Sequence, residues 1–221
     1  ETEGGDAALC AGTNEDPDAV ATTLTLNQAG DSTFDGVFAG LGALEKTGAG
    51  TLTLTNAQTL LGGLTVNDGV LATGTTGSGG PATFGTFTDT LAITVNTDGQ
   101  LDVNNVDTFG SLTNSGIVNV NADQTVVTAQ TRGGTLNLNA NLTTTGAFSV
   151  DDEGSNAGIV NVNGDHTITA DGGLAGNGDI IVDDGHNLTL SQQEGTISTF
   201  SGNITSDTDP NTSRFTLDGG G

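Results

Sequence analysis

Apolar residues recur in short alternating pairs along most of the chain. The pattern is glycine, any residue, an apolar residue, any residue, a second apolar residue, and then Asn, Asp or Thr. The glycines that begin it are Gly50, Gly62, Gly99, Gly116, Gly134, Gly158 and Gly178. Two apolar residues two positions apart point to the same side of a β-strand, whereas an amphipathic helix needs a period of about 3.6 residues. The pattern therefore predicts short β-strands.

The spacing of these glycines predicts how the strands are arranged. From Gly99 onward, successive glycines are 17, 18, 24 and 20 residues apart, which is the length of one coil of a β-helix with loops of varying size. Coils stacked at about 4.8 Å align the apolar pairs into continuous ladders. We therefore predict an all-β, single-stranded parallel β-helix (β-solenoid) of roughly nine coils, about 45 Å long. Val118, Leu136 and Val160 should lie one above another in it.

Glycine and asparagine at fixed places in the pattern have predicted structural roles. Glycine before the strand supplies the backbone freedom needed at a tight corner. Asn or Asp after the strand tolerates a left-handed backbone and can turn the chain. Asn stacked on Asn can also form an amide ladder along the axis. The 8 Phe residues are expected to fill wide parts of the lumen or to cover its ends.

Composition agrees with a thin, elongated core. Only 33% of the 221 residues are hydrophobic and 36 are glycine. That is too little apolar material for a compact globule of this length, but enough for a one-dimensional stack of small cores. Residues 1–21 are acidic and polar, which predicts an N-terminal extension before a solenoid domain over residues 22–221. Gly74–Pro81 and Asp151–Asn156 are predicted to be protruding loops.

The charge balance argues against several classes of partner. The chain has 27 acidic and 3 basic residues, a formal net charge of −24, so it has no basic patch for nucleic acid or an anionic lipid surface. No apolar run approaches the ~18 residues of a membrane span, and we expect no membrane insertion. Cys10 is the only cysteine. It is either a free thiol, which we favour, or an intermolecular link.

Two histidines and several acidic residues are the candidate ligands for a metal ion. His166 and His186 each lie eight residues after a pattern glycine, so we expect them to stack on adjacent coils as a weak site for Zn²⁺ or another cation. Carboxylates on neighbouring turns could likewise bind Ca²⁺ weakly. The acidic candidates are Asp151, Asp152, Asp183 and Asp184. The hypothesis that we favour is that all six are solvated turn residues, with no resident metal or cofactor.

An enzyme acting on polysaccharides is the catalytic alternative, because β-helices are common among such enzymes. Glycoside hydrolysis needs two positioned carboxylates, and stacked Asp residues could imitate them. With 3 basic residues and no Tyr or Trp, however, the chain has little to hold a polyuronate or to stack on a sugar ring. It also lacks a Ser-His-Asp order, a phosphate loop and clustered Cys. We therefore predict no catalytic residues and no enzymatic activity.

The stretch Phe34–Gly74 resembles the autotransporter-associated β-strand repeat. The most specific part is LEKTGAGTLTL, from Leu44 to Leu54, followed by GGLTVN from Gly62 and by Gly69-Val70-Leu71. Leu60-Leu61 stands where the repeat usually has an aromatic residue before the glycine pair. The resemblance implies a right-handed β-helix that is exported to the bacterial surface, usually as the passenger of a larger adhesin.

Three functional hypotheses follow. The first is a self-assembling filament or matrix protein, since terminal coils of a solenoid expose unpaired strand edges that can stack on another copy. The second is a passenger fragment of an adhesin that presents loops to host or neighbouring cell surfaces. The third is the polysaccharide-active enzyme. We favour the first, a secreted non-enzymatic protein of the cell surface or extracellular matrix whose main partner is another copy of itself.

Overall fold

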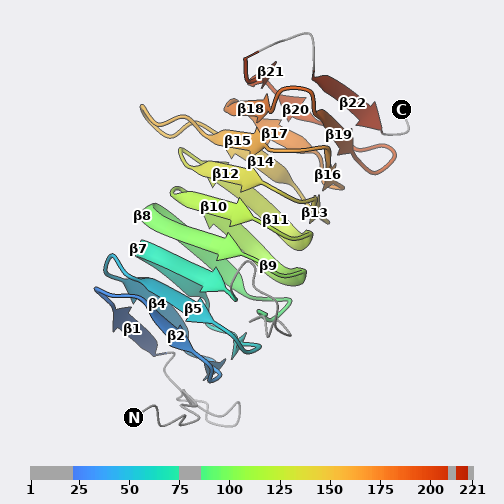
Figure 1. The fold of residues 1–221 in the computed structure, drawn as a ribbon. Helices are drawn as coiled ribbons and strands as arrows, with labels where there is room; N and C mark the ends of the chain where they lie inside the picture. Colours follow the sequence, from blue (N-terminus) through green and yellow to red (C-terminus); the bar gives the residue numbers. More distant parts are fainter. Residues whose placement is uncertain (1–21, 75–85, 209–212, 219–221) are drawn as a thin grey trace.

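The computed structural model describes residues 22–74, 86–208 and 213–218, and every regular element within these ranges is a β-strand. Strands pair in parallel with the strands of neighbouring coils, so that segments far apart in the sequence lie side by side along one axis (Figure 1). The stack has about nine coils. The predicted all-β solenoid is confirmed. Within the same ranges there is no helix long and apolar enough to cross a membrane.

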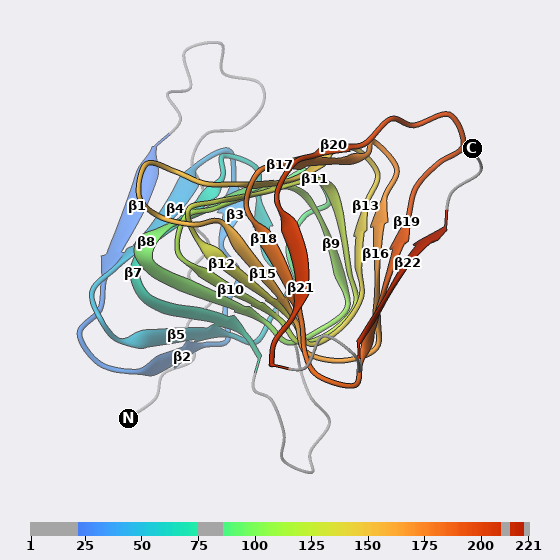
Figure 2. The same cartoon turned by 90° about the horizontal axis from the view of Figure 1, so that it is seen from above.

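Each coil passes over three faces, which surround a common lumen (Figure 2). The first face contains β1 (Thr23–Asn27), β4 (Ala43–Thr47), the first parts of β7 (Leu64–Thr73) and β8 (Ala92–Val103), the second parts of β9 (Asp107–Asn114) and β11 (Gln124–Arg132), β14 (Phe148–Asp151), β17 (Leu174–Gly176) and β20 (Thr199–Phe200). The second face contains β2 (Ser32–Phe34), β5 (Thr51–Leu54), the second parts of β7 and β8, β10 (Ile117–Val120), β12 (Thr135–Leu138), β15 (Ile159–Val162), β18 (Asp179–Val182) and β21 (Asn203–Ser206).

The third face closes the coil. It contains the first parts of β9 and β11, then β13 (Leu142–Thr144), β16 (His166–Ala170), β19 (Asn187–Ser191) and β22 (Arg214–Asp218). Near the N-terminal end, β3 (Ala39–Gly40) and β6 (Thr59–Leu60) pair with each other in a small separate sheet. From β8 onward, the described chain therefore runs from the first face to the second and third faces of a coil before it rises to the next.

Aliphatic side chains stack in register inside the lumen. Val118 pairs with Leu136, and Leu136 pairs with Val160, as the sequence predicts. All three are fully buried, because alternate residues of each strand point inward. Phe109 and Phe148 are also buried in the lumen. The thin continuous core is therefore confirmed.

A column of glycines runs up the corner before the second face, but its membership differs from the prediction. Gly50 and Gly62 do not belong to one column, because Leu52 pairs with Leu71 on the second face whereas Leu64 pairs with Leu44 on the first. Gly69 is the residue that follows Gly50 in the column. The sequence pattern alone does not separate them, because the same alternation occurs on two faces of successive coils.

The reason for glycine differs from the prediction at two positions of this column. Gly116 and Gly134 do not have a positive φ. A Cβ added at Gly116 would instead lie 2.2 Å from the carbonyl oxygen of Asn96 and 2.3 Å from that of Gly99. At Gly116 glycine is therefore needed because the backbones of adjacent coils approach closely, and not for a turn conformation. Gly69 combines both reasons, since its φ is 66° and an added Cβ would lie 2.4 Å from the carbonyl oxygen of Gly48.

The asparagines after the second-face strands form the predicted amide ladders. Asn121 donates from Nδ2 to Oδ1 of Asn104 at 2.8 Å, and Asn139 donates to Asn121 at 2.7 Å. Asn163 donates to Asn139 at 2.9 Å. The predicted left-handed backbone is wrong, because glycine alone has a positive φ within the described ranges. Asparagine is used here for its side-chain amide.

Several predicted features lie partly or wholly outside the described residues. These are the extension over residues 1–21, Cys10 within it, and the Gly74–Pro81 loop after Gly74. The second predicted loop, Asp151–Asn156, is a short turn in which Glu153 and Asn156 exchange backbone hydrogen bonds of 2.8 and 3.0 Å. It lies at the corner between the first and second faces.

Candidate functional site

The two histidines lie on adjacent coils near the C-terminal end, but they do not stack. His166 is the first residue of β16 and pairs with Leu188, two residues beyond His186. Val162 and Val182 are in register on the second face, yet Leu188 follows Val182 by six positions whereas His166 follows Val162 by four. The longer turn of the later coil therefore shifts His186 out of phase with His166, and the predicted alignment is wrong.

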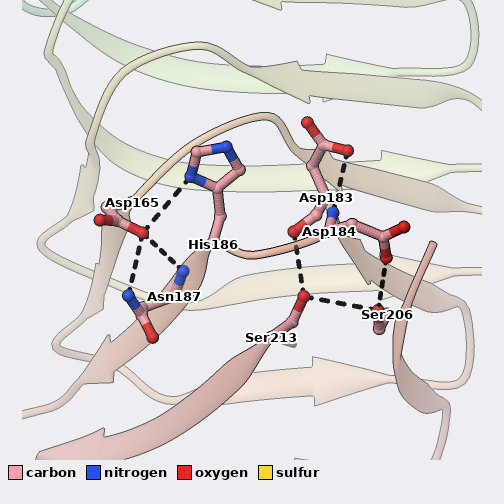
Figure 3. Close-up of polar contacts among 7 residues, drawn as sticks. All are labelled: Asp165, Asp183, Asp184, His186, Asn187, Ser206 and Ser213. Atoms are coloured by element: carbon pink, nitrogen blue, oxygen red, sulfur yellow. Dashed lines mark hydrogen bonds and ion pairs between the residues drawn. The ribbon is translucent and has the colours of Figure 1, made fainter. Parts of the chain in front are cut away.

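His186 contacts a carboxylate rather than the other imidazole. Its Nδ1 lies 3.5 Å from Oδ1 of Asp165 (Figure 3). The same carboxylate oxygen accepts hydrogen bonds from the backbone N–H of Asn187 at 2.7 Å and from its Nδ2 at 3.0 Å. The backbone hydrogen bond from Asn187 is the main cause that lowers the pKa of Asp165. Asp165 thus joins one coil to the next.

His166 is less exposed than a freely solvated turn residue. Burial is the main cause that lowers its pKa, and nearby Asp123 opposes the shift. The lowered pKa favours the neutral imidazole at pH 7. Chemically, His166 and His186 offer two separate imidazoles in different environments, and not a matched pair of ligands.

Asp183 and Asp184 lie in the turn after β18 and bond to the last coil (Figure 3). Asp184 accepts hydrogen bonds from the hydroxyl of Ser206 at 2.9 Å and from the backbone N–H of Thr208 at 3.0 Å. The hydroxyl of Ser213 donates to the carbonyl oxygen of Asp183 at 3.0 Å. These contacts hold the turn against the following coil, so the pair has a structural role.

Asp151 and Asp152 lie at another corner, at the end of β14. Oδ2 of Asp151 accepts from Nε2 of Gln130 at 3.1 Å, and Oδ1 of Asp152 accepts from the backbone N–H of Gly158 at 3.1 Å. Asp151 and Asp152 therefore also bond within and between coils. The structure does not gather the six predicted ligand residues into one site.

No cluster of metal-ligand side chains is assembled in the part of the chain that the structure describes. Residues 22–74, 86–208 and 213–218 contain no group of three or more His, Cys, Asp or Glu side chains placed to hold one ion. Structural Zn²⁺ needs about four ligands and Ca²⁺ six to eight oxygen ligands. The polar turns act instead as side-chain links between coils.

One buried charged group escaped the sequence analysis. Lys46 lies within the lumen, fully buried, at the level between Leu26 and Val66. Its Nζ donates to the carbonyl oxygens of Gly48 at 2.8 Å and Asp68 at 2.9 Å. Burial lowers the pKa of Lys46, and the charge of Asp68 partly opposes this. Its position two residues after the inward-pointing Leu44 is the signal that could have identified it.

The sequence pattern also did not identify a second candidate site, which is an uncharged patch on the outside of the second face. We call it the amide face, and it consists of the outward residues of β10, β12 and β15 with the asparagine after each strand. One amide column consists of Asn119, Asn137 and Asn161. The other consists of Asn121, Asn139 and Asn163. A third column beside them is Ile117, Thr135 and Ile159. Carboxylates lie at both ends of the amide face along the solenoid axis. Asp102 lies on the preceding coil, and Asp179 and Asp183 lie on the following coil.

Both amide columns are hydrogen-bonded along the solenoid axis. Nδ2 of Asn137 donates to Oδ1 of Asn119 at 2.7 Å, and Asn161 donates to Asn137 at 2.8 Å. A shallow recess of about 250 Å³ follows at the C-terminal end, lined by Asn161, Asn163, Ile181, Asp183 and Asp207. The face and the recess form a continuous polar surface on the second face.

Comparison with known proteins gives one match, which covers a short part of the chain. Residues 44–72 match the model of the passenger-associated-transport-repeat. A search of curated proteins found no significant match, and a search of solved structures found none either. The matched residues cover most of β4, all of β5 and β6, and most of β7. They therefore span the second coil and the first two faces of the third. Repeat and solenoid together fit a structural domain of the autotransporter passenger type.

Proposed function

We propose that this protein is a non-enzymatic structural rod of the bacterial cell surface or extracellular matrix, whose copies stack end to end into filaments. The observation that carries the proposal is that both ends of the described stack are open. β1 pairs only with β4, and β22 only with β19, among the described strands. An exposed parallel edge is a template for another strand.

The N-terminal end supports the proposal with its apolar side chains. Phe34 and Phe38 stack there with ring centroids 4.3 Å apart. They line an open cavity of about 410 Å³ with Leu24, Leu26 and Leu52. In an interior coil, such side chains are covered by the next coil. A second copy would supply that cover.

The C-terminal end is similar. Phe215 and Leu217 are 41% and 68% exposed, whereas Leu188 and Leu190, their register partners one coil earlier, are 1% and 3% exposed. One added coil would therefore remove substantial apolar surface from water. The contact is head to tail, and such a contact makes an open filament whenever its rotation does not close a ring.

Electron microscopy and light scattering across a concentration series test this stacking. We expect filaments of the native protein, and single short rods when Leu217→Glu places a carboxylate in the end contact. Val127→Glu is the matched control, because Val127 is 49% exposed on a middle coil and the variant has the same net charge. Native protein that stays as single rods at every concentration would refute end-to-end assembly.

The alternative is a single rod that serves as the passenger fragment of an adhesin and presents its loops to host or neighbouring surfaces. The match of residues 44–72 to a passenger repeat favours this alternative. Isolated rods in the microscope, together with binding to cell surfaces, would support it over the filament.

The proposal includes neither catalysis nor a cofactor. Support comes from Asp165 and Asp184, whose carboxylates accept hydrogen bonds from neighbouring coils. A panel of polysaccharides incubated with the protein should yield no new reducing ends. Turnover that Asp184→Asn abolishes without unfolding the protein would instead establish the polysaccharide-active enzyme.

A further inference from the structure

We propose that the amide face is a binding surface for a neutral polysaccharide chain that lies along the solenoid axis. This inference concerns the side of the rod, so it does not depend on end-to-end stacking. It rests on three observations about the same surface: its free hydrogen-bonding capacity, its lack of charge, and the aliphatic column beside the amides.

The amides retain unused hydrogen-bonding groups. A side-chain amide has two N–H donors and two acceptor positions on oxygen. The ladder uses one donor and one acceptor position of Asn137, and likewise of Asn139. The remaining groups form a repeating donor and acceptor array with a spacing of about 4.8 Å along the axis. Sugar hydroxyls, which both donate and accept, are complementary to such an array.

The array is also preorganised. Each amide is held by the amide of the next coil, and Asn119, Asn137 and Asn161 are half-buried in the sheet surface. Side chains that are already ordered lose little further rotamer entropy when a ligand binds. Weak contacts to successive amides can therefore add up to a useful affinity for an extended polysaccharide chain.

The distribution of charge around the amide face favours an uncharged ligand. The protein has a net charge of −24, yet the outward positions of β10, β12 and β15 and the asparagine after each hold no carboxylate. An anionic polymer would be repelled by the surrounding acids, including Asp102 and Asp183. A neutral polymer would meet no such penalty. Neutral hydroxylated chains therefore fit this surface better than polyuronates.

The third column supplies, through Ile117, Ile159 and the methyl group of Thr135, the apolar contact that aromatic residues often provide. Ile117 is 41% exposed, and Thr135 and Ile159 continue the column beside the amides. The C–H groups of a sugar ring can pack on these side chains while its hydroxyls reach Asn119 or Asn137. The recess beside Ile181 then offers a place for a ring or chain end at the C-terminal side.

Affinity electrophoresis in native gels tests the inference, with soluble β-glucan, mannan and dextran as neutral probes and alginate as the anionic probe. We expect at least one neutral probe to retard the native protein and alginate not to retard it. The triple variant Asn121→Thr, Asn139→Thr, Asn163→Thr should bind about tenfold more weakly, since three hydrogen-bonding groups are shortened. The control triple variant Thr125→Ala, Thr143→Ala, Thr169→Ala changes the third face and should bind normally.

A second variant tests binding without removing any ladder hydrogen bond, so that a loss of binding is not explained by unfolding. Ile181→Arg fills the recess beyond the last amide of its column, so it leaves every ladder hydrogen bond intact and should still weaken retardation. Circular dichroism checks that each variant is folded. Lack of retardation by all neutral probes, or equal retardation of the native protein and both binding variants, would overturn the inference. A lateral dimer that the asparagine variant abolishes, with no glycan binding, would show instead that the face joins copies of the chain.

Discussion

At the scale of single residues, close contact between coils decides which positions must be glycine. Gly116→Ala would place a Cβ against the carbonyl oxygens of Asn96 and Gly99, both of which belong to the backbone. We expect a loss of about 3 kcal/mol in the free energy of unfolding, because the coils must move apart. Gly30→Ala is the matched control, since no atom lies within 4 Å of the added Cβ there. Urea unfolding of both variants measures the difference, and equal losses would contradict the explanation.

Lys46 makes a pH-dependent contribution to stability. Burial lowers the pKa of Lys46 in the folded protein, so the unfolded chain binds more protons between that pKa and the ordinary value of about 10.4. The free energy of unfolding should therefore rise with pH across this window, relative to the variant Lys46→Met. Urea unfolding at pH 7, 9 and 10 provides the measurement. Arg132→Met, on the surface, should show no such trend, and a constant difference between the native protein and Lys46→Met would contradict the prediction.

Individual residues also show where sequence reasoning succeeded and failed. Val118 and Leu136 were placed correctly, because alternation with a period of two dictates which side chains point inward. Lys46 follows the same alternation, but lysine is almost never fully buried in proteins, so the pattern alone does not place it in the lumen. His186 was misplaced because the length of the turn before it depends on local backbone geometry, including the positive φ of Gly185, and alternation carries no information about turns.

At the scale of structural elements, the amide ladders join strands that are far apart in the sequence. Asn139 makes two ladder hydrogen bonds, whereas Asn163, at the end of the same column, makes one. Asn139→Ala should therefore lower the free energy of unfolding by about 2 kcal/mol and Asn163→Ala by about 1 kcal/mol, at roughly 1 kcal/mol for each bond. Thermal unfolding of the two variants tests the ratio. A larger loss at Asn163 would show that the ladder is not the source of the stability.

The sequence predicts that the elements are short strands in stacked coils, but it does not predict which face of the solenoid each strand belongs to. Strands and coil spacing follow from the alternation and the repeated glycines. The division into three faces does not, because Gly50 and Gly62 begin identical patterns on different faces of successive coils. The predicted stacking of His166 and His186 is wrong because a phase counted from one face does not hold after a turn of different length.

At the scale of the whole molecule, the large negative charge opposes the compact stack. The net charge is −24, and self-repulsion of this kind destabilises a folded state. Raising NaCl from 10 mM to 1 M shortens the screening length from about 30 Å to about 3 Å and should raise Tm by several degrees at pH 8. The rise should be smaller at pH 4, where many carboxylates are protonated. A Tm that is independent of salt at pH 8 would contradict this prediction.

The direction of the backbone hydrogen bonds has a mechanical consequence. Bonds such as those from Thr135 to Gly116 and from Ile159 to Gly134 run between coils, parallel to the long axis. A pull on the two ends loads these bonds directly, and the end coil can peel away while its neighbours stay intact. A coil of about 20 residues adds about 4.8 Å to the stack but releases roughly 65–70 Å of extended chain. Under tension, such a tether would lengthen stepwise and absorb a sudden load before it broke.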